Sequence, residues 1–246
     1  SEEYLGISFE TAERNTNARF NATFIAQLGD SFTTFYQCGI RLRGSGSRSR
    51  YPRNIKVELP SSELWQGYDE FNLNTQFTYN QLLGSLFYRE AGLPVYESKA
   101  VQVRMNGINH AAPENAANGS HHHHHYGMYV HNEPVNRHFV RAHYPLDANG
   151  NLYRMAGSGT RWEYFPASSD LAASYTGAGW DKENNSGVND WTDLHEFIRV
   201  LSTASGPGYL DQIKTVMDLE SWLRNLAVST ILTNGENSLF TGRDDD

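Results

Sequence analysis

The stretch that decides the fold is Phe35-Tyr36-Gln37-Cys38-Gly39-Ile40-Arg41-Leu42-Arg43, followed after a polar loop by Ile55-Lys56-Val57-Glu58-Leu59. Aromatic and branched residues fill the first segment. In the second, apolar residues alternate with charged ones, which is the pattern of a half-buried strand. Gly44 and Gly46 interrupt the chain between the two segments. The stretch therefore predicts a β-hairpin with a long loop that carries glycines and arginines.

Further strands are expected in the first half of the chain and shortly after it. The β-forming residues 99–105 lead into a turn at Asn106-Gly107, and residues 126–131 supply a partner strand after a long insertion. A short strand is expected at 151–155. Residues 156–190 are rich in Gly, Ser, Asn and Asp and predict a polar connection.

Helices dominate the last third, with one more at residues 78–91. Thr78 is the expected N-cap of that helix. Asp193 and Glu196 have capping-box spacing before an apolar stripe, and Asp218 is the expected cap of a final long helix. Strands followed by helices are typical of an α+β fold with a sheet-rich first lobe and a helical second lobe.

Composition excludes several classes of protein. The chain has 246 residues, 39% of them hydrophobic and 20% charged, which excludes a disordered tail or a coiled coil. The formal net charge of −8 argues against nucleic-acid binding. No apolar run is long enough to predict a transmembrane helix. The single cysteine, Cys38, excludes an internal disulfide and is typical of a small buried hydrophobic residue.

The arginine-rich hairpin is the first candidate site. Five arginines fall between positions 41 and 53 of this acidic chain. Backbone N–H groups of a Gly- and Ser-rich loop bind phosphate oxygens, and arginines add bidentate donors. Lys56, on the returning strand, supplies a point charge for a phosphate. The alternative interpretation is an exposed, flexible hairpin loop.

Three other motifs have two interpretations each. Glu133 ends a strand beside a proline, where it either holds a lysine or a nucleotide or is simply a turn acid. The run His121–His125 either binds Ni²⁺ or Zn²⁺ loosely or belongs to a mobile low-complexity loop, which we favour. The amides and carboxylates of residues 234–237 and 242–246 suit Mg²⁺ or form a solvated acidic turn.

Nine short segments, taken in order, resemble the spore-coat-protein-H (CotH) kinase family of atypical protein kinases. The segments are 40–44, 55–59, 71–74, 88–94, 103–107, 126–130 with Glu133, 151–154, 189–194 and 222–234. The resemblance implies a single domain with a kinase-like bilobal α+β fold. Its sheet-rich N-lobe is expected at about 20–135 and its mainly helical C-lobe at about 136–246, truncated before the family's last metal-binding segment, Trp-Asp-x-Asp.

The resemblance also implies ATP, with Mg²⁺ or Mn²⁺, and phosphoryl transfer to a Ser or Thr hydroxyl of a surface or secreted protein. The residues it assigns to the nucleotide are Arg41, Arg43, Lys56 and Glu133. The residues it assigns to catalysis are Glu236 and Asp245, and those assigned to the metal are Asp245 and Asn234. Glu236 stands where many relatives have aspartate, and the added methylene moves the carboxylate by about 1 Å.

A second function class fits the same residues. The chain would then be a catalytically inactive extracellular or surface module that binds or supports a partner on a kinase-like scaffold. Only four of its twenty basic residues are lysines, and its loops are polar, as is typical of secreted surface proteins. Both hypotheses place the protein outside the cell or on its surface, with no membrane span and no nucleic-acid partner.

Overall fold

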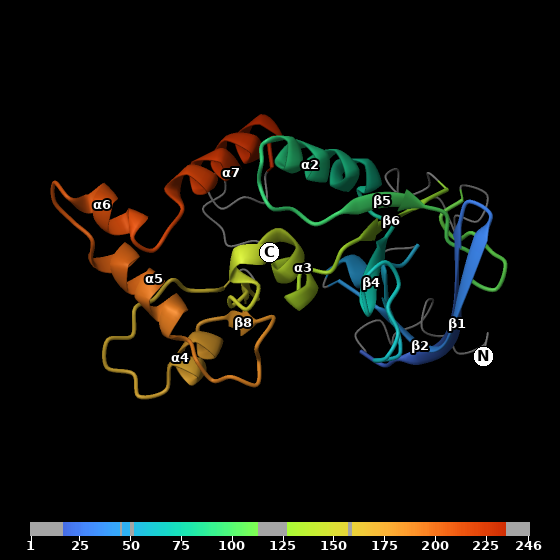
Figure 1. Cartoon of the computed structure of the whole chain (residues 1–246), viewed down its shortest axis with the longest axis horizontal. Helices are drawn as coiled ribbons and strands as arrows, with labels where there is room; N and C mark the ends of the chain where they lie inside the picture. Colours follow the sequence, from blue (N-terminus) through green and yellow to red (C-terminus); the bar gives the residue numbers. More distant parts are fainter. Residues whose placement is uncertain (1–16, 45, 50–51, 113–126, 157–158, 235–246) are drawn as a thin grey trace. The chain divides into compact units, whose positions relative to one another are not determined.

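The computed structural model describes residues 17–44, 46–49, 52–112, 127–156 and 159–234. It divides the chain into two compact units. The first contains residues 1–86 and 96–134, and the second contains residues 87–95 and 135–246. Both strands and helices are present, as an α+β fold requires, and each unit is described by itself below (Figure 1).

A six-stranded antiparallel sheet forms the centre of the first unit (Figure 1). In spatial order its strands are β1 (Phe20–Leu28), β2 (Ser31–Leu42), β3 (Ile55–Glu58), β4 (Glu70–Asn74), β6 (Tyr129–Asn132) and β5 (Ser98–Val101). The predicted hairpin is confirmed, because β2 and β3 pair with Arg41 opposite Lys56. The single-turn 3₁₀ helix η2 (Gly46–Ser49) lies in its loop. The strand expected at 99–105 is shorter and ends at Val101.

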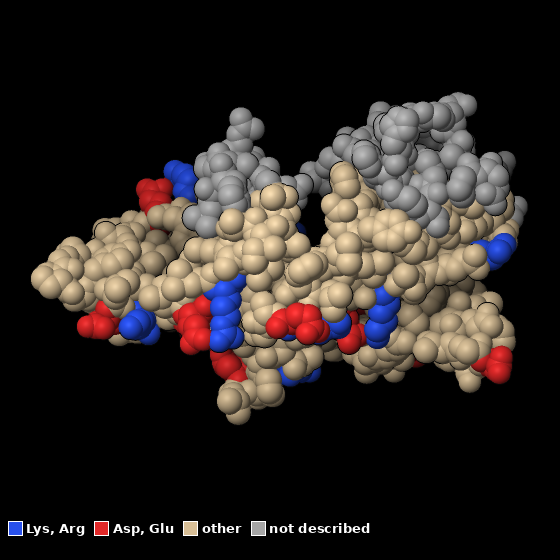
Figure 2. Space-filling view, turned by 90° about the horizontal axis from the view of Figure 1, so that it is seen from above, with Lys and Arg blue, Asp and Glu red and all other residues tan. Residues whose placement is uncertain are grey.

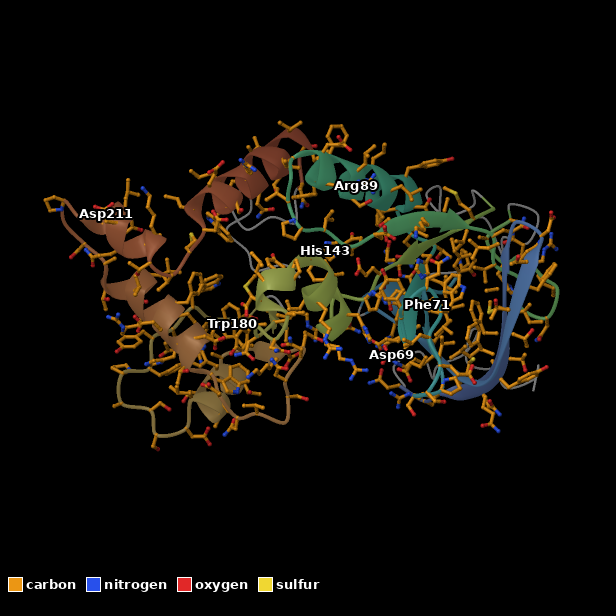
Figure 3. The ribbon with its side chains drawn as sticks, in the orientation of Figure 1. Asp69, Phe71, Arg89, His143, Trp180 and Asp211 are labelled. Carbon is orange, nitrogen blue, oxygen red and sulfur yellow. The ribbon has the colours of Figure 1, made fainter. Side chains whose placement is uncertain are left out.

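One face of this sheet carries the apolar core of the unit. Phe71 and Cys38 are fully buried there, and the Trp65 ring lies 4.9 Å from the Phe71 ring. Figure 3 shows Phe71 among the densely packed side chains of the sheet. The buried members are Phe35, Cys38, Ile55, Val57, Leu59, Phe71, Leu73, Ala111 and Tyr129. The prediction that Cys38 is a buried hydrophobic residue is thus confirmed.

Helix α2 (Thr78–Glu90) agrees with the predicted helix, but its cap differs. The carbonyl of Phe77 accepts the first helical hydrogen bond from Gln81, so Phe77 precedes the helix and Thr78 is already its first residue. Phe77 takes a positive φ of 51°, which turns the chain into the helix. Thr78 is therefore not the N-cap, and within the described residues its buried hydroxyl has no hydrogen-bond partner.

The second unit is mainly helical, with one small hairpin. Its elements are α3 (Arg137–His143), the 3₁₀ turn η5 (Pro145–Asp147), β7 (Tyr153–Met155), α4 (Leu171–Gly177), β8 (Trp180–Lys182), α5 (Thr192–Thr203), α6 (Tyr209–Lys214) and α7 (Leu219–Ile231). Strands β7 and β8 pair antiparallel. Its core packs the Tyr175 and Trp191 rings, stacked 6.3 Å apart, against Leu194 and Ile198.

Two helix caps in this unit test the sequence predictions. Asp218 accepts a hydrogen bond from the Ser221 N–H at 3.1 Å, which confirms it as the cap of α7. Asp193 is not a cap, because α5 begins at Thr192 and the Thr192 N–H donates to Asp190 at 3.0 Å. Asp193 instead accepts a hydrogen bond from the Tyr153 hydroxyl at 2.5 Å. No helix in the described residues is long and apolar enough to cross a membrane.

Candidate functional site

The candidate site is the polar face of the six-stranded sheet, opposite the core. Arg41 on β2 lies directly opposite Lys56 on β3, Lys56 opposite Asn72 on β4, and Asn72 opposite Asn132 on β6. Residues directly opposite one another in a sheet point to the same face, and their sequence neighbours point to the other. The register therefore brings two predicted nucleotide-binding residues, Arg41 and Lys56, together in one cross-strand row.

Two glutamates lie next to this row and pair with its basic side chains. Lys56 Nζ lies 2.5 Å from Glu70 Oε2, and Arg41 Nε lies 3.3 Å from Glu58 Oε1. Arg19 forms a second ion pair with Glu58. These Lys56, Glu70, Arg41 and Glu58 side chains are only 18–25% exposed, so solvent screens the pairs less than it screens surface pairs. The two glutamates therefore offset part of the basic charge of the face, since Arg19 and Arg41 share Glu58.

These ion pairs change the pKa of the Glu58 carboxyl. Its partial burial acts to raise the pKa of the carboxyl, but hydrogen bonds from Arg19 and Arg41 and the charges of Arg19 and Lys56 outweigh burial, so the pKa lies below its ordinary value. Glu58 is thus held ionised as an acceptor for two guanidinium groups. Figure 2 shows that most basic side chains on the visible surface also lie beside acidic ones.

A chain of hydrogen bonds holds Arg43 against the same face. Arg43 Nη1 donates to Asn74 Oδ1 at 2.5 Å, and Asn74 Nδ2 donates to Gln81 Oε1 at 2.8 Å. The Gln81 oxygen also accepts from Asn132 Nδ2 at 2.5 Å, and Asn132 accepts from the Ser98 hydroxyl at 2.6 Å. Burial lowers the pKa of Arg43, with the charge of Arg41 acting in the same direction. Gln81 thereby connects α2 to the face that carries the basic residues.

Sequence reasoning missed Asn74, Gln81 and Asn132 as part of this site. The signal for Asn74 was present, since Asn72 and Asn74 flank Leu73 with the two-residue period of one strand face. Gln81 had no comparable signal, because nothing in a helix's own sequence says which sheet residues it contacts.

The hairpin loop is fastened to the segment that follows β4. The Thr75 N–H donates to Asn54 Oδ1 at 2.9 Å, and the Thr75 hydroxyl donates to the Pro52 carbonyl at 2.7 Å. Gln76 Nε2 donates to the Ser47 carbonyl at 3.1 Å. The described part of the loop is therefore held by buried hydrogen bonds at its β3 end and by a partly buried one at Ser47.

Glu133, the fourth predicted nucleotide-binding residue, lies just after β6 and is 2% exposed. Its Oε2 accepts a hydrogen bond from the Glu97 N–H at 3.0 Å, and its own N–H donates to the Glu97 carbonyl at 2.9 Å. Burial, followed by the charge of Glu133, raises the pKa of Tyr68 to about 12. Glu133 thus lies beside Tyr68 and Glu97, the residue before β5, whereas Lys56 is paired with Glu70.

The remaining predicted residues belong to the second unit or fall outside the described ranges. Asn234 follows α7, is exposed, and donates its N–H to the Ser229 carbonyl at 3.0 Å. Glu236, Asp245 and the run His121–His125 lie outside the described residues. Within the described ranges, no group of three or more His, Cys, Asp and Glu side chains could hold a metal ion.

A small polar pocket of about 370 Å³ lies in the second unit beside the first turns of α4 and α5. Asp170 and Asp190 line it. Each carboxylate already accepts a helix N–H, Asp170 from Ala173 at 3.0 Å and Asp190 from Thr192 at 3.0 Å. Asp170 is the N-cap of α4, and Asp190 accepts the first N–H of α5, so both carboxylates are less available to a ligand than their residue types suggest.

The family model described as CotH kinase protein matches residues 40–242, which is most of the chain. The chain therefore belongs to the CotH kinase family, as the ordered motifs predicted. The match includes Arg41, Lys56, Asn74 and Gln81 of the polar face. A comparison with curated proteins returns no match.

Proposed function

We propose that this protein binds ATP with Mg²⁺ or Mn²⁺ and transfers the γ-phosphoryl group to a Ser or Thr hydroxyl of a protein substrate at the cell surface or in the secreted fraction. The observation that carries the proposal is the row of Arg41 and Lys56 on one sheet face, within a chain of the CotH kinase family. In this proposal the two compact units are the N-lobe and C-lobe of a kinase-like fold.

The chemistry of this face suits the phosphates of a nucleotide. An ammonium group binds phosphate oxygens as a point charge, and a guanidinium group binds them through two parallel N–H donors. Lys56 and Arg41 are oriented by ion pairs with Glu70 and Glu58, which lie one cross-strand row away. Phosphate oxygens would compete with those glutamates for the same donors. The hydrogen bonds through Asn74 and Gln81 would keep Arg43 in place while phosphate replaces the glutamates.

Residues beyond the sheet complete the proposal. When bound, a divalent metal ion neutralises charge that develops on the transferring phosphoryl group. We assign Asn234 and Asp245 as its ligands and Glu236 or Asp245 as the group that positions the substrate hydroxyl. These assignments rest on the family resemblance. Among the described residues, the basic side chains of the sheet suit the phosphates, and no cluster of acidic or histidine side chains suits the metal.

A phosphotransfer assay on the full-length protein tests this proposal. Labelled ATP with Mg²⁺ or Mn²⁺ is supplied, and incorporation into protein is compared between the wild type and Lys56→Ala. Loss of about tenfold or more in the variant is expected, because a charged donor to the phosphates is removed. No incorporation by the wild type, together with no ATP-dependent rise in Tm, would contradict the kinase and favour the inactive binding module.

A further inference from the structure

Strand β1 is the edge of the six-stranded sheet. It pairs with β2 on one side, and no strand of the described residues pairs with its other side (Figure 1). Its sequence, Phe20 to Leu28, contains no charged residue and no proline. Proteins usually protect an exposed edge with such residues or with a bulge. The only bulge lies between Ala22 and Phe24, which leaves Phe24–Leu28 as a regular segment at the edge.

The register of the hairpin shows which backbone groups of this segment face outward. Leu28 and Ser31 flank the two-residue turn and close it, as the first hydrogen-bonded pair of a tight hairpin does. Hydrogen-bonded and non-hydrogen-bonded pairs alternate along an antiparallel ladder. The pairs that Gln27 and Ile25 form with β2 are therefore non-hydrogen-bonded. Their N–H and C=O groups point away from β2, toward the free edge.

Exposed apolar side chains lie next to these groups. Ile25 is 60% exposed, and Phe32 and Tyr36, on the same face of the hairpin, are 66% and 68% exposed. Ile25 lies opposite Thr34, and Phe32 lies opposite Gln27. An edge that no described strand covers, with adjoining apolar side chains, suits a partner that is itself an extended strand and brings apolar contacts of its own.

We propose that the partner is the same strand of a second copy of this chain, paired antiparallel about a two-fold axis at Ala26. In that register Ile25 of each copy lies opposite Gln27 of the other, and these are the residues whose N–H and C=O groups face outward. Each such pair exchanges two hydrogen bonds, as an antiparallel pair of this type requires. Phe24 of each copy lies opposite Leu28 of the other, and the two sheets become continuous.

Charge and symmetry favour a second copy over an unrelated peptide. A two-fold interface is self-complementary, and antiparallel pairing of one segment with itself satisfies this automatically. The chain carries a net charge of −8, yet β1 is uncharged, so like charges do not meet along the strand. A short edge buries less area than a stable dimer interface, so we expect a concentration-dependent dimer with a micromolar dissociation constant.

Sedimentation equilibrium of the full chain, over about a hundredfold range of concentration, tests the proposal. The wild type should approach twice the monomer mass. Gln27→Pro removes one outward N–H but no hydrogen bond to β2, and proline is tolerated at such edge positions. This variant should remain monomeric. Gln27→Ala is the matched control, because it changes the same side chain but keeps the outward N–H, so it should still dimerise.

A monomeric wild type at every concentration overturns the proposal. So does a dimer that persists in Gln27→Pro, or one that is lost in Gln27→Ala alone. If both variants are monomeric, amide hydrogen exchange of the wild type decides. Slower exchange at Ile25 and Gln27 with rising concentration supports edge pairing, and unchanged exchange at both amides overturns it.

Discussion

Acid should destabilise this protein through His131, a buried histidine on β6. The residue is 2% exposed, and the rings of Trp65 and Phe71 each lie 5.1 Å from its imidazole. Neither ring nitrogen has a hydrogen-bond partner in another described residue. Burial lowers the pKa of His131 to about 4, the charge of Lys99 acts in the same direction, and the charge of Glu97 opposes it.

The magnitude follows from the linkage between protonation and folding. In the unfolded chain the imidazole has its ordinary pKa of 6.5, so between pH 6.5 and about 4 the unfolded state binds more protons than the folded state. The contribution of the neutral His131 side chain to the free energy of unfolding is therefore complete above pH 6.5, and it is lost as the pH falls toward 4. With these two values the loss from His131 alone is about 2 kcal/mol between pH 8 and pH 5.

Urea unfolding at about pH 8 and pH 5 measures this loss, in the wild type and in His131→Leu. The apolar variant should lose about 2 kcal/mol less than the wild type over that interval. Val130→Ala, at the neighbouring buried position, is the matched control and should be weakened by a similar amount at both pH values. An equal pH dependence in His131→Leu and the wild type would refute the reasoning.

Three further substitutions test the packing of each unit by urea unfolding. Asn74→Leu removes the acceptor of the Arg43 guanidinium and should lower the free energy of unfolding by about 1–3 kcal/mol. Unchanged stability would show that the hydrogen bond between Arg43 and Asn74 does not stabilise the fold. Gly179→Ala should cost about 1–3 kcal/mol, because φ is +96° and the new Cβ would lie 2.9 Å from the Thr160 backbone; a neutral result would contradict this close approach. Asp218→Ala should lower the free energy of unfolding through loss of the α7 cap, whereas Asp218→Asn should retain most of the stability. Equal losses in these two variants would argue against the cap.

The sequence predicted the elements whose signals are local. The alternation of Ile55, Val57 and Leu59 located β3, and Asp218 located the start of α7. Helix α2 was found from its apolar spacing, but its cap was assigned one residue too late because Phe77, which precedes the helix, takes a positive φ. Such a backbone conformation at a bulky residue has no sequence signature.

Two parts of the fold were not predicted. Strand β1 was missed although apolar residues alternate with polar ones along it except at Ile25, and the extra residue of the bulge lies on β2. Helix α4 and strand β8 lie in the polar stretch 156–190, where the buried rings of Tyr175 and Trp180 hold them in place. Tertiary packing overrides weak local propensity in α4 and β8.

The candidate site was predicted in its residue types but not in its pairings. Arg41 and Lys56 were chosen from charge and position, and the sheet register brings them together. That Glu70 is the partner of Lys56 follows from the pairing of β3 with β4, which sequence periodicity does not determine. The roles assigned to Glu236 and Asp245 remain predictions, since both lie outside the described residues.

The measurement that tests the central claim most directly is calorimetric titration of ATP with Mg²⁺ into the wild type, Lys56→Ala and Lys99→Ala. Lys99 lies in the same sheet opposite His131, and therefore on the core side, and forms an ion pair with Glu97 at 2.8 Å. We expect Lys56→Ala to weaken ATP binding by about tenfold or more and Lys99→Ala to leave it unchanged. Equal affinities in all three proteins, or no binding by the wild type, would contradict the assignment of the polar sheet face to the nucleotide.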